Sequence, residues 1–357
     1  MAEGSKLRLG VIGCGTAAVP VCAAIAASQA TELVVVQDAN PDMARDMATR
    51  HGVRWAVAVE HVLDDLDVEA VYIAVPHHVL ASLAMQALTA GKHVLSEKPM
   101  AIRLDDADAL IALAEERRRT LDVFFQMRWV DPYAQARALV RAGALGEIIG
   151  VRLQTLIDKR PDYWRVGYAG RSSQPWRAKK AQAGGGVVLM NTSHALDAVQ
   201  HITGLDVFSV TAEVATLVAD VEVEDTAAAT LRFSNGAVGS LFAGAHIAGA
   251  ERAERIELYG TRGQIQVPDP YGDGAPAVYL REPWGDLAAA RWHTLPRAPT
   301  DVYARAVETF ARTIRSGEPT TTGARNARQT LATVLAIYQS AAERQTIHVP
   351  VREVPYA

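Results

Sequence analysis

Short aliphatic runs alternate with longer helical segments over the first third of the chain. The runs that we predict as strands cover residues 7–12, 31–37, 54–57, 71–75, 93–96 and 121–125. Helical segments separate them, including one that ends at Gly91, a residue type suited to a helix C-terminus. Regular alternation of strand and helix is typical of a parallel sheet with right-handed crossovers. The pattern predicts an α/β fold with an N-terminal Rossmann domain, a doubly wound parallel sheet, over residues 1–125.

The pattern changes after residue 125. A helix is predicted over 131–143, and two more over 301–316 and 324–343. The strand-like runs between them are longer and are joined by short turns; they cover 148–157, 207–218, 226–233, 237–244, 255–259 and 264–267. Consecutive strands with short turns favour antiparallel pairing. Residues 126–357 are therefore predicted to form a C-terminal α+β domain with a large, mostly antiparallel open sheet that serves substrate binding and oligomerisation.

The predicted second sheet also suggests how the protein assembles. Its helices should cover one face and leave the other open. We expect Val210, Ala212, Val214 and Thr216 to lie on that open face and to be buried by another subunit. A homodimer or homotetramer is the expected assembly.

Composition narrows the class of partner. The chain has 357 residues, 49% hydrophobic and 21% charged, and a net charge of -4, which gives no electrostatic footprint for nucleic acid or an anionic membrane. Cys14 and Cys22 lack zinc-ligand spacing and are too few for a disulfide framework, so we expect no metal site. With no signal peptide and no long apolar stretch, a cytoplasmic protein that binds a small molecule is expected.

A glycine motif follows the first predicted strand and opens the first predicted helix. In this G-x-G-x-x-A motif Gly13 permits a tight turn, Gly15 lets a pyrophosphate approach the backbone, and Ala18 allows close packing of helix on strand. Thr16 and Ala17 lie between them, where the helix N-terminus offers free N–H groups to phosphate. The motif in this context predicts a dinucleotide site.

Asp38 ends the second predicted strand, twenty residues after Ala18. A carboxylate at this place hydrogen-bonds the adenosine ribose and repels a 2′-phosphate. The next residues, Ala39 and Asn40, include no arginine that could hold such a phosphate. Asp38 therefore predicts NAD rather than NADP, and the alternative is that it only caps the helix near Pro41.

The stretch 93–99 places a charged pair where another strand ends. In open parallel sheets, ligands bind beyond the carboxyl ends of the strands, so Lys98 should face the ligand. Pro99 restricts the backbone of Lys98 and presents it from a stiff turn. The alternative is a solvated surface turn.

A second stretch with chemical potential begins at a triple glycine, residues 184–186, and continues into a helix. His194 and Asp197 stand at i and i+3, on one helix face. A neutral histidine accepts a proton from a hydroxyl, and a neighbouring carboxylate or amide can hold its tautomer. A helical histidine is otherwise often structural, but with Lys98 it would supply a base and a hydroxyl-orienting cation for alcohol oxidation.

Taken together, these motifs resemble the Gfo/Idh/MocA family of sugar and cyclitol oxidoreductases over nearly the whole chain. The matching pieces are residues 10–15, 71–76, 91–99, 126–128 with Pro132, 143–147, 176–177, the triple glycine with His194 and Asp197, and 260–263. The resemblance implies that Lys98 positions the substrate and that Arg128 contacts it. It also implies cofactor contacts, which fall on Val75, Pro76, His77, Glu97, Gln126, Trp176 and Arg177.

Two positions depart from the family pattern. Met190 stands where members usually carry an aspartate, four residues before the histidine, and Leu80 replaces a common histidine. The proton relay therefore cannot be carried over whole. Either Asn191, which would then also contact substrate, orients His194, or the acid–base role falls to a tyrosine such as Tyr163.

Three functions follow as hypotheses. The first is an NAD-dependent dehydrogenase or reductase acting on a ring hydroxyl of a sugar, glycoside or cyclitol. The second, a chemistry that the family resemblance implies for some branches, is an NAD-dependent glycoside hydrolase with no net redox change. The third is a non-catalytic cofactor-binding regulator, against which Lys98 and His194 argue because a sensor needs no proton relay.

The segment 160–180 concentrates basic side chains among aromatic ones. Aromatic rings stack on sugars, and arginines bind carboxylate, sulfonate or phosphate in a two-pronged geometry. We expect Arg165 and Arg171, each near an aromatic residue, to hold a carboxylate or sulfonate on an anionic sugar. The alternative is a solvated loop.

Overall fold

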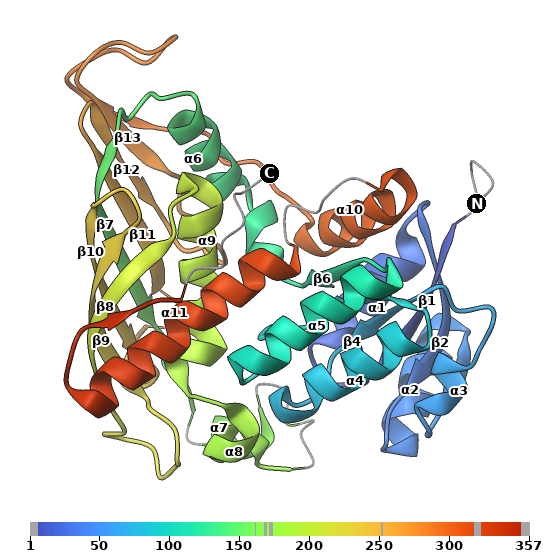
Figure 1. The fold of residues 1–357 in the computed structure, drawn as a ribbon. Coiled ribbons are helices and arrows are strands. Elements are labelled where there is room, and N and C mark those ends of the chain that lie inside the picture. Colours follow the sequence, from blue (N-terminus) through green and yellow to red (C-terminus); the bar gives the residue numbers. More distant parts are fainter. Residues whose placement is uncertain are drawn as a thin grey trace.

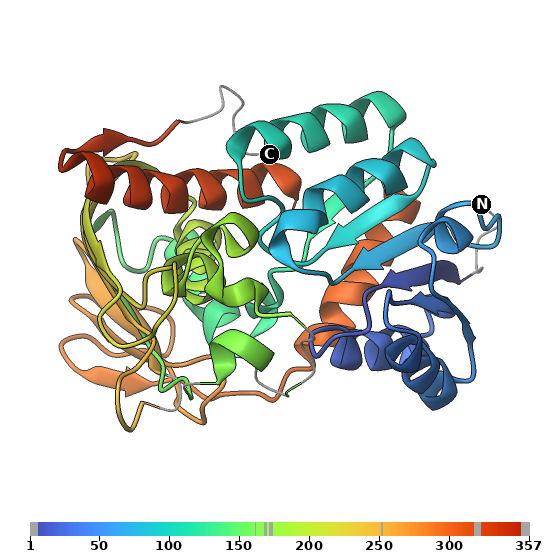
Figure 2. The same ribbon diagram turned by 90° about the horizontal axis from the view of Figure 1, so that it is seen from below.

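The computed structural model describes residues 6–160, 162–167, 170, 174–250, 253–317 and 323–350. Two sheets dominate it, each with its own helices (Figure 1). Seen from below, the first sheet with its helices and the second sheet lie at opposite ends of the molecule, with α11 running between them (Figure 2). The interface between the two halves is where the candidate site lies.

The first sheet has six parallel strands and confirms the predicted doubly wound fold. Its strands are β1 (Leu7–Ile12), β2 (Thr31–Gln37), β3 (Arg54–Ala56), β4 (Ala70–Ile73), β5 (His93–Ser96) and β6 (Leu121–Val123). Their order is β3-β2-β1-β4-β5-β6. The direction of winding reverses between β1 and β4, which creates a crevice at the carboxyl ends of these two strands.

Helices cover both faces of this sheet. They are α1 (Ala18–Ala27), α2 (Pro41–His51), α3 (Glu60–Leu63), α4 (His77–Thr89) and α5 (Leu104–Arg117). Val21 and Ile25 of α1 share one hydrophobic core with Leu9 and Val11 of β1. Helices α4 and α5 pack on each other over the opposite face.

Helix α10 (Val302–Ser316) lies against the first sheet's helices, although the sequence assigns it to the second domain (Figure 1). Its residues Val307 and Phe310 are buried in the same core as Val21 of α1. Asp301 caps the helix by accepting hydrogen bonds from the backbone of Tyr303 and Ala304. The chain thus returns to the Rossmann half after building the second sheet.

The second sheet has nine strands in the order β14-β13-β12-β11-β7-β10-β9-β8-β15. They are β7 (Ile148–Leu156), β8 (Val207–Ala215), β9 (Thr226–Phe233), β10 (Val238–Gly244), β11 (Ala253–Gly260), β12 (Gly263–Val267), β13 (Ala277–Leu280), β14 (Trp292–Thr294) and β15 (Ile347–His348). Among the described strands of this sheet, β7 and β10 pair in parallel and the other pairs are antiparallel, which confirms the mostly antiparallel prediction.

Three helices pack on one face of the second sheet (Figure 1). They are α6 (Asp131–Arg141), α9 (Ser193–Thr203) and α11 (Ala324–Glu343), while the short helices α7 (Tyr163–Val166) and α8 (Lys180–Ala183) lie near the first domain. Neither α11, at 20 residues, nor any other helix in the described ranges combines the length and apolar character needed to cross a membrane.

The prediction that Val210 and Ala212 lie on the open face of this sheet is wrong, while Thr216 is exposed just after β8 ends. Val210 and Ala212 are 0% and 7% exposed, because β8 packs them under α11. The alternation of β8 directs its apolar set to the helices, as strand geometry requires. The open face instead carries Phe208, Val238 and Phe242, which are 46%, 46% and 43% exposed.

Candidate functional site

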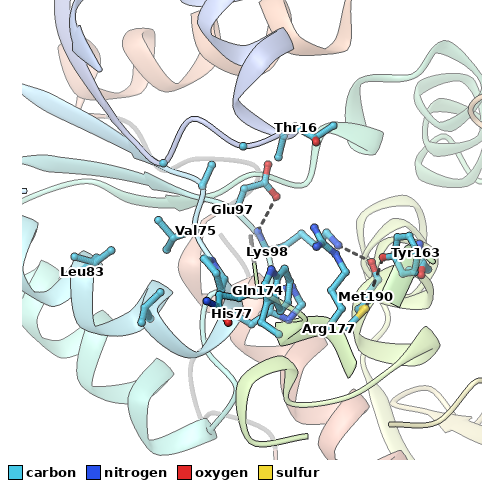
Figure 3. Close-up of a pocket in the computed structure, with 18 of the residues that line it drawn as sticks. Thr16, Val75, His77, Leu83, Glu97, Lys98, Tyr163, Gln174, Arg177 and Met190 are labelled. Carbon is cyan, nitrogen blue, oxygen red and sulfur yellow. Dashed lines mark hydrogen bonds between the residues drawn. The ribbon is translucent and has the colours of Figure 1, made fainter. Parts of the chain in front are cut away.

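A cavity of about 780 Å³ lies where the carboxyl ends of the first sheet's strands face the second domain. Its walls come from the loop after β1, the ends of β2, β4 and β5, the end of β7, and the segment leading into α9. Figure 3 shows side chains from both domains pointing into it. The crevice at the β1–β4 reversal therefore opens directly into a space bounded by the second domain.

The glycine loop forms one end of the cavity. Gly13 has φ 92°, and a Cβ there would lie 2.3 Å from the Ala74 carbonyl oxygen, so only glycine fits. At Gly15 a Cβ would meet nothing within 4 Å, and the backbone lies open toward the cavity. Ala18 is fully buried behind the loop and packs rather than lining the cavity. The loop fits a pyrophosphate held at the start of α1.

Asp38 lines the same end of the cavity. Its carboxylate accepts hydrogen bonds from the backbone N–H groups of Cys14 and Asn40, both at 2.8 Å. The side chain that caps α2 is Asn40, which accepts from the backbone of Asp42. The capping alternative for Asp38 is therefore wrong, and its carboxylate is fixed beside the glycine loop, where a ribose would lie.

Lys98 reaches across the cavity to the second domain. Its Nζ donates a hydrogen bond to the Met190 carbonyl oxygen at 2.6 Å (Figure 3). Burial lowers the pKa of Lys98, against the opposing charge of Glu97. Glu97 is itself held by the Tyr72 hydroxyl at 2.6 Å. The solvated-turn alternative is wrong, because both members of the charged pair are half-buried in the cavity wall.

The segment after the triple glycine forms a π-helical turn, Val188–Thr192, that leads into α9. At Gly186 a Cβ would lie 1.8 Å from the Glu224 carbonyl oxygen, so the chain passes too closely for any side chain. The Glu224 carboxylate accepts from the backbone N–H groups of Gly186 and Val188 at 2.7 and 2.9 Å. π-helical turns are frequent at functional sites, and this one directs Met190 and Asn191 into the cavity.

His194 lines the cavity from the first turn of α9 and is 7% exposed. Its ring meets Phe125 edge-on, with centroids 5.8 Å apart. Asp197 does not hold its tautomer as expected, because the Asp197 carboxylate forms a two-pronged pair with Arg128, whose Nε lies 2.7 Å from Oδ2. Both side chains of this pair are 1% exposed.

Two predicted substrate contacts are corrected by this geometry. Arg128 is buried in its ion pair and does not line the cavity, and Arg165 is exposed outside it. Arg171 lies outside the described residues. The remaining predicted residues do line the cavity; they are Gly13, Gly15, Thr16, Ala17, Asp38, Val75, Pro76, His77, Glu97, Lys98, Gln126, Tyr163, Trp176, Arg177, Asn191 and His194.

His77 joins the two halves of the molecule. Its Nδ1 lies 2.7 Å from the Ala183 carbonyl oxygen, and its ring centroid is 4.6 Å from that of Trp176. Burial and then the charge of Lys98 lower the pKa of His77 to about 3. The ring is therefore neutral near pH 7, with its proton on Nδ1 facing the carbonyl.

Several lining residues come from places where the sequence gives no local signal. Thr155 ends a strand, Glu254 begins one, and Gln174, Tyr271 and Tyr303 lie in loops or at a helix start. Glu254 is 8% exposed and places a carboxylate at the second-domain side of the cavity. These residues meet only because the two domains fold against each other.

Sequence comparison places both halves of the chain in one family of proteins. Residues 7–125 match the model described as oxidoreductase family, NAD-binding Rossmann fold, and residues 133–266 match that of the GFO/IDH/MocA C-terminal domain. The chain is 28% identical over 255 residues to levoglucosan dehydrogenase of Pseudarthrobacter phenanthrenivorans, an alignment covering 65% of this chain and 63% of that protein. It is 27% identical over 350 residues to 1,5-anhydro-D-fructose reductase of Ensifer adhaerens, covering 96% and 98%.

Comparison with solved structures gives the same family. Levoglucosan dehydrogenase in complex with NADH and levoglucosan superposes with a TM-score of 0.87 at 25% identity. The superposition covers 97% of this chain and 100% of that one. The likeness therefore includes both domains and the interface that bounds the cavity.

Proposed function

We propose that this chain, which belongs to the Gfo/Idh/MocA family of oxidoreductases, interconverts a ring hydroxyl and a ketone on a sugar or cyclitol with NAD(H). One observation carries the proposal. Lys98 Nζ, on the Rossmann domain, meets the Met190 carbonyl oxygen beside His194, in a cavity continuous with the glycine loop. The Lys98 cation and the proton-accepting His194 thus lie where the nicotinamide end of a bound dinucleotide would be.

The residues at the first end of the cavity fit NAD. The open backbone at Gly15 suits a pyrophosphate, and the Asp38 carboxylate suits the adenosine ribose hydroxyls. Trp176, Glu97 and Gln126 line the next part of the cavity and would border the nicotinamide riboside. When bound, NAD supplies the acceptor for a hydride. The chain's own residues bind the cofactor, orient the substrate and move its hydroxyl proton.

Cofactor preference is the first prediction. NAD(H) should bind roughly tenfold tighter than NADP(H), or about 1.4 kcal/mol, because the Asp38 carboxylate repels a 2′-phosphate. Isothermal calorimetry with both cofactors measures the difference. Asp38→Ala should narrow the gap, while Asp42→Ala, an exposed acid in the first turn of α2, should leave it unchanged. Equal affinities for the two cofactors in the natural protein would contradict the assignment.

At the substrate end, Lys98 is placed to orient the reacting hydroxyl, and His194 or Tyr163 to take its proton. The Asn191 side-chain oxygen is buried and accepts no hydrogen bond from the described residues, which leaves the amide for a sugar hydroxyl. Arg177 lies over the rings of Tyr163 and Trp176, at 5.6 and 4.4 Å from their centroids. Arg177 lines the cavity and could meet an anionic group on the sugar, whereas Arg165 lies outside the cavity.

A substrate panel tests the function. The purified protein with NAD should form NADH, followed by its ultraviolet absorbance, with at least one member of a panel of levoglucosan, inositols, free sugars and glycosides. Uronic and sulfonated sugars form a second arm of the panel that examines substrate charge. Chromatography for released aglycone detects the redox-neutral hydrolase. A protein that binds NAD yet converts no member in either assay would contradict an enzymatic role.

Assembly remains a proposal that rests on the open face of the second sheet. Phe208 lies on β8, and Val238 and Phe242 lie on β10, the two strands on either side of β9. We expect a second copy to cover them in a homodimer or homotetramer. Light scattering at micromolar concentration should give the mass of two or four chains, and Phe242→Arg should lower it. A monomeric mass for the natural protein would rule the proposal out.

A further inference from the structure

Lys159 is a buried lysine just behind the cavity wall. It is 2% exposed, and its Nζ lies 4.0 Å from the centroid of the Tyr163 ring and 4.6 Å from that of Trp164. Within the described part of the chain, this amine donates no hydrogen bond. An ammonium group buried without such a bond is costly, so packing alone does not explain a lysine here.

The backbone around Lys159 is firmly held. Its N–H donates to the Ala245 carbonyl oxygen at 2.8 Å, and its own carbonyl lies 3.0 Å from His246 Nδ1. The other ring nitrogen of His246 accepts from Trp164 Nε1 at 3.2 Å. These bonds fix a neutral histidine tautomer and keep Trp164 and Lys159 in place. The amine is therefore held over the Tyr163 ring.

Charged groups on three other segments surround this amine. Burial, and then the positive charges of Lys98 and Arg177, lower the pKa of Lys159 well below its ordinary value, and Glu224 opposes them. Arg177 also lies over the Tyr163 ring, at 5.6 Å. Lys159 is thus able to gain or lose a proton under conditions in which an exposed lysine stays charged.

Tyr163 connects this cluster to the substrate. Its hydroxyl donates to Met190 Sδ at 3.7 Å, and Lys98 Nζ donates to the carbonyl oxygen of the same residue (Figure 3). Met190 occupies the position where the family pattern has an aspartate. The hydroxyl and the ammonium group thus both contact Met190, the first at its side chain and the second at its backbone.

We propose that Lys159 is a positioning residue that acts through Tyr163, whose hydroxyl oxygen takes the proton of the substrate hydroxyl. The inference rests on the proposed dehydrogenase function. In the oxidation, the ring C–H bond breaks and its electron pair leaves with the hydrogen as a hydride to NAD. The O–H bond breaks and its proton passes to the Tyr163 oxygen, and a C=O bond forms.

To accept that proton, Tyr163 must first lack its own. A phenol beside a neutral amine and a phenolate beside an ammonium group hold the same number of protons, so the two groups titrate as a pair. An ammonium group over the ring favours the phenolate by electrostatic attraction. Burial lowers the pKa of Lys159 and so opposes its ammonium form, while a phenolate in the adjacent ring attracts that charge; the fixed geometry therefore links the protonation of the two groups.

The pH dependence of kcat tests this role. For Lys159→Met, the acid limb of the oxidation profile should move to higher pH by about one unit, because the phenolate loses its cation. At pH values below the acid limb, kcat should fall roughly tenfold. At pH values well above it, kcat should equal that of the natural protein. NAD affinity should not change. A profile that keeps its acid limb in a folded Lys159→Met protein would overturn the proposal.

A double-mutant cycle separates action through Tyr163 from a general effect. Tyr163→Phe should abolish the acid limb, and adding Lys159→Met to it should cause no further loss of kcat. If the two mutations lower kcat by independent factors, so that the double variant shows their product, the proposal is overturned. Lys92→Met is the matched control, because Lys92 is 7% exposed but its amine binds the carbonyls of Asp65 and Val68 away from the cavity. It should leave the acid limb in place.

The cycle remains decisive if one variant fails to fold. Thermal melting reports folding, and Lys159→Gln replaces Lys159→Met if the latter is unfolded. Tyr163→Phe alone also decides, because a retained acid limb with near-normal turnover would exclude the tyrosine. Failure of the proposed function is distinct from these outcomes, since the natural protein would then form no NADH with any member of the panel.

Discussion

Lys98→Ala should lower kcat by roughly two to four orders of magnitude, the range for loss of a positioned proton-transfer group. The lysine is half-buried just after β5 and its ammonium group is aimed at Met190 across the cavity, so the mutation removes the charge proposed to orient the reacting hydroxyl. Steady-state kinetics with the substrate found in the panel measures the loss.

The control for this variant is cofactor binding. NAD affinity should stay nearly intact, because the glycine loop and Asp38, the residues proposed to hold the dinucleotide, lie at the far end of the cavity. Lys180→Ala, an exposed lysine on α8, should leave turnover unchanged. Near-normal kcat in Lys98→Ala would remove this lysine from the mechanism. His194→Ala should show a loss of similar size, and near-normal turnover there would remove the histidine from the mechanism.

Asp197→Ala should destabilise the fold by about 3 to 5 kcal/mol, the effect of removing one partner from a buried ion pair. The mutation leaves the guanidinium group of Arg128 uncompensated at 1% exposure. Urea unfolding followed by circular dichroism measures the change. The double variant Arg128→Met with Asp197→Ala should be less destabilised than the sum of the two single variants, because no unpaired charge remains.

An exposed pair gives the matched comparison. Glu115 pairs with Arg325 at side-chain exposures of 51% and 46%, and Glu115→Ala should cost less than about 1 kcal/mol. If Asp197→Ala costs no more than this exposed control, the Arg128–Asp197 pair does not anchor α9, and the position of His194 must be set in another way.

The parts of the site that follow from sequence are those in which one short segment decides the geometry. The glycine loop and Asp38 lie on consecutive strand–helix units, and the carboxyl ends of parallel strands meet at one edge. Lys98 follows the same rule on β5. For these residues, recognising the strand–helix alternation was enough to place the side chains beside one cavity.

The remaining features depend on contacts between distant segments. The family resemblance implies a substrate contact for Arg128, but its pairing with Asp197 links positions 69 residues apart, which no local pattern reveals. The alternation of β8 correctly predicts a strand, yet it does not determine which face the helices cover, so the face of Val210 cannot be predicted from it. Helix α10 has an amphipathic pattern that suits either domain, and packing decides that it joins α1.

The positions of Lys159 and Glu254 also could not be predicted from the sequence alone. Neither belongs to a motif. Glu254 lines the cavity only because the two domains fold against each other, and Lys159 is placed behind the wall by its contact with the Tyr163 ring. Strands β13, β14 and β15, of four, three and two residues, are too short to give a period of their own and form by pairing with neighbours.

Under the proposed function, a hydride moves between a ring carbon of the substrate and NAD in this cavity. The most direct measurement uses the panel substrate that is converted, carrying deuterium at the ring carbon to be oxidised, with mass spectrometry of the cofactor and the sugar after turnover. Deuterium should appear in the NADH, and the sugar should be recovered as a ketone. Conversion of substrate with no deuterium ever reaching the cofactor, in a protein that binds NAD, would contradict it.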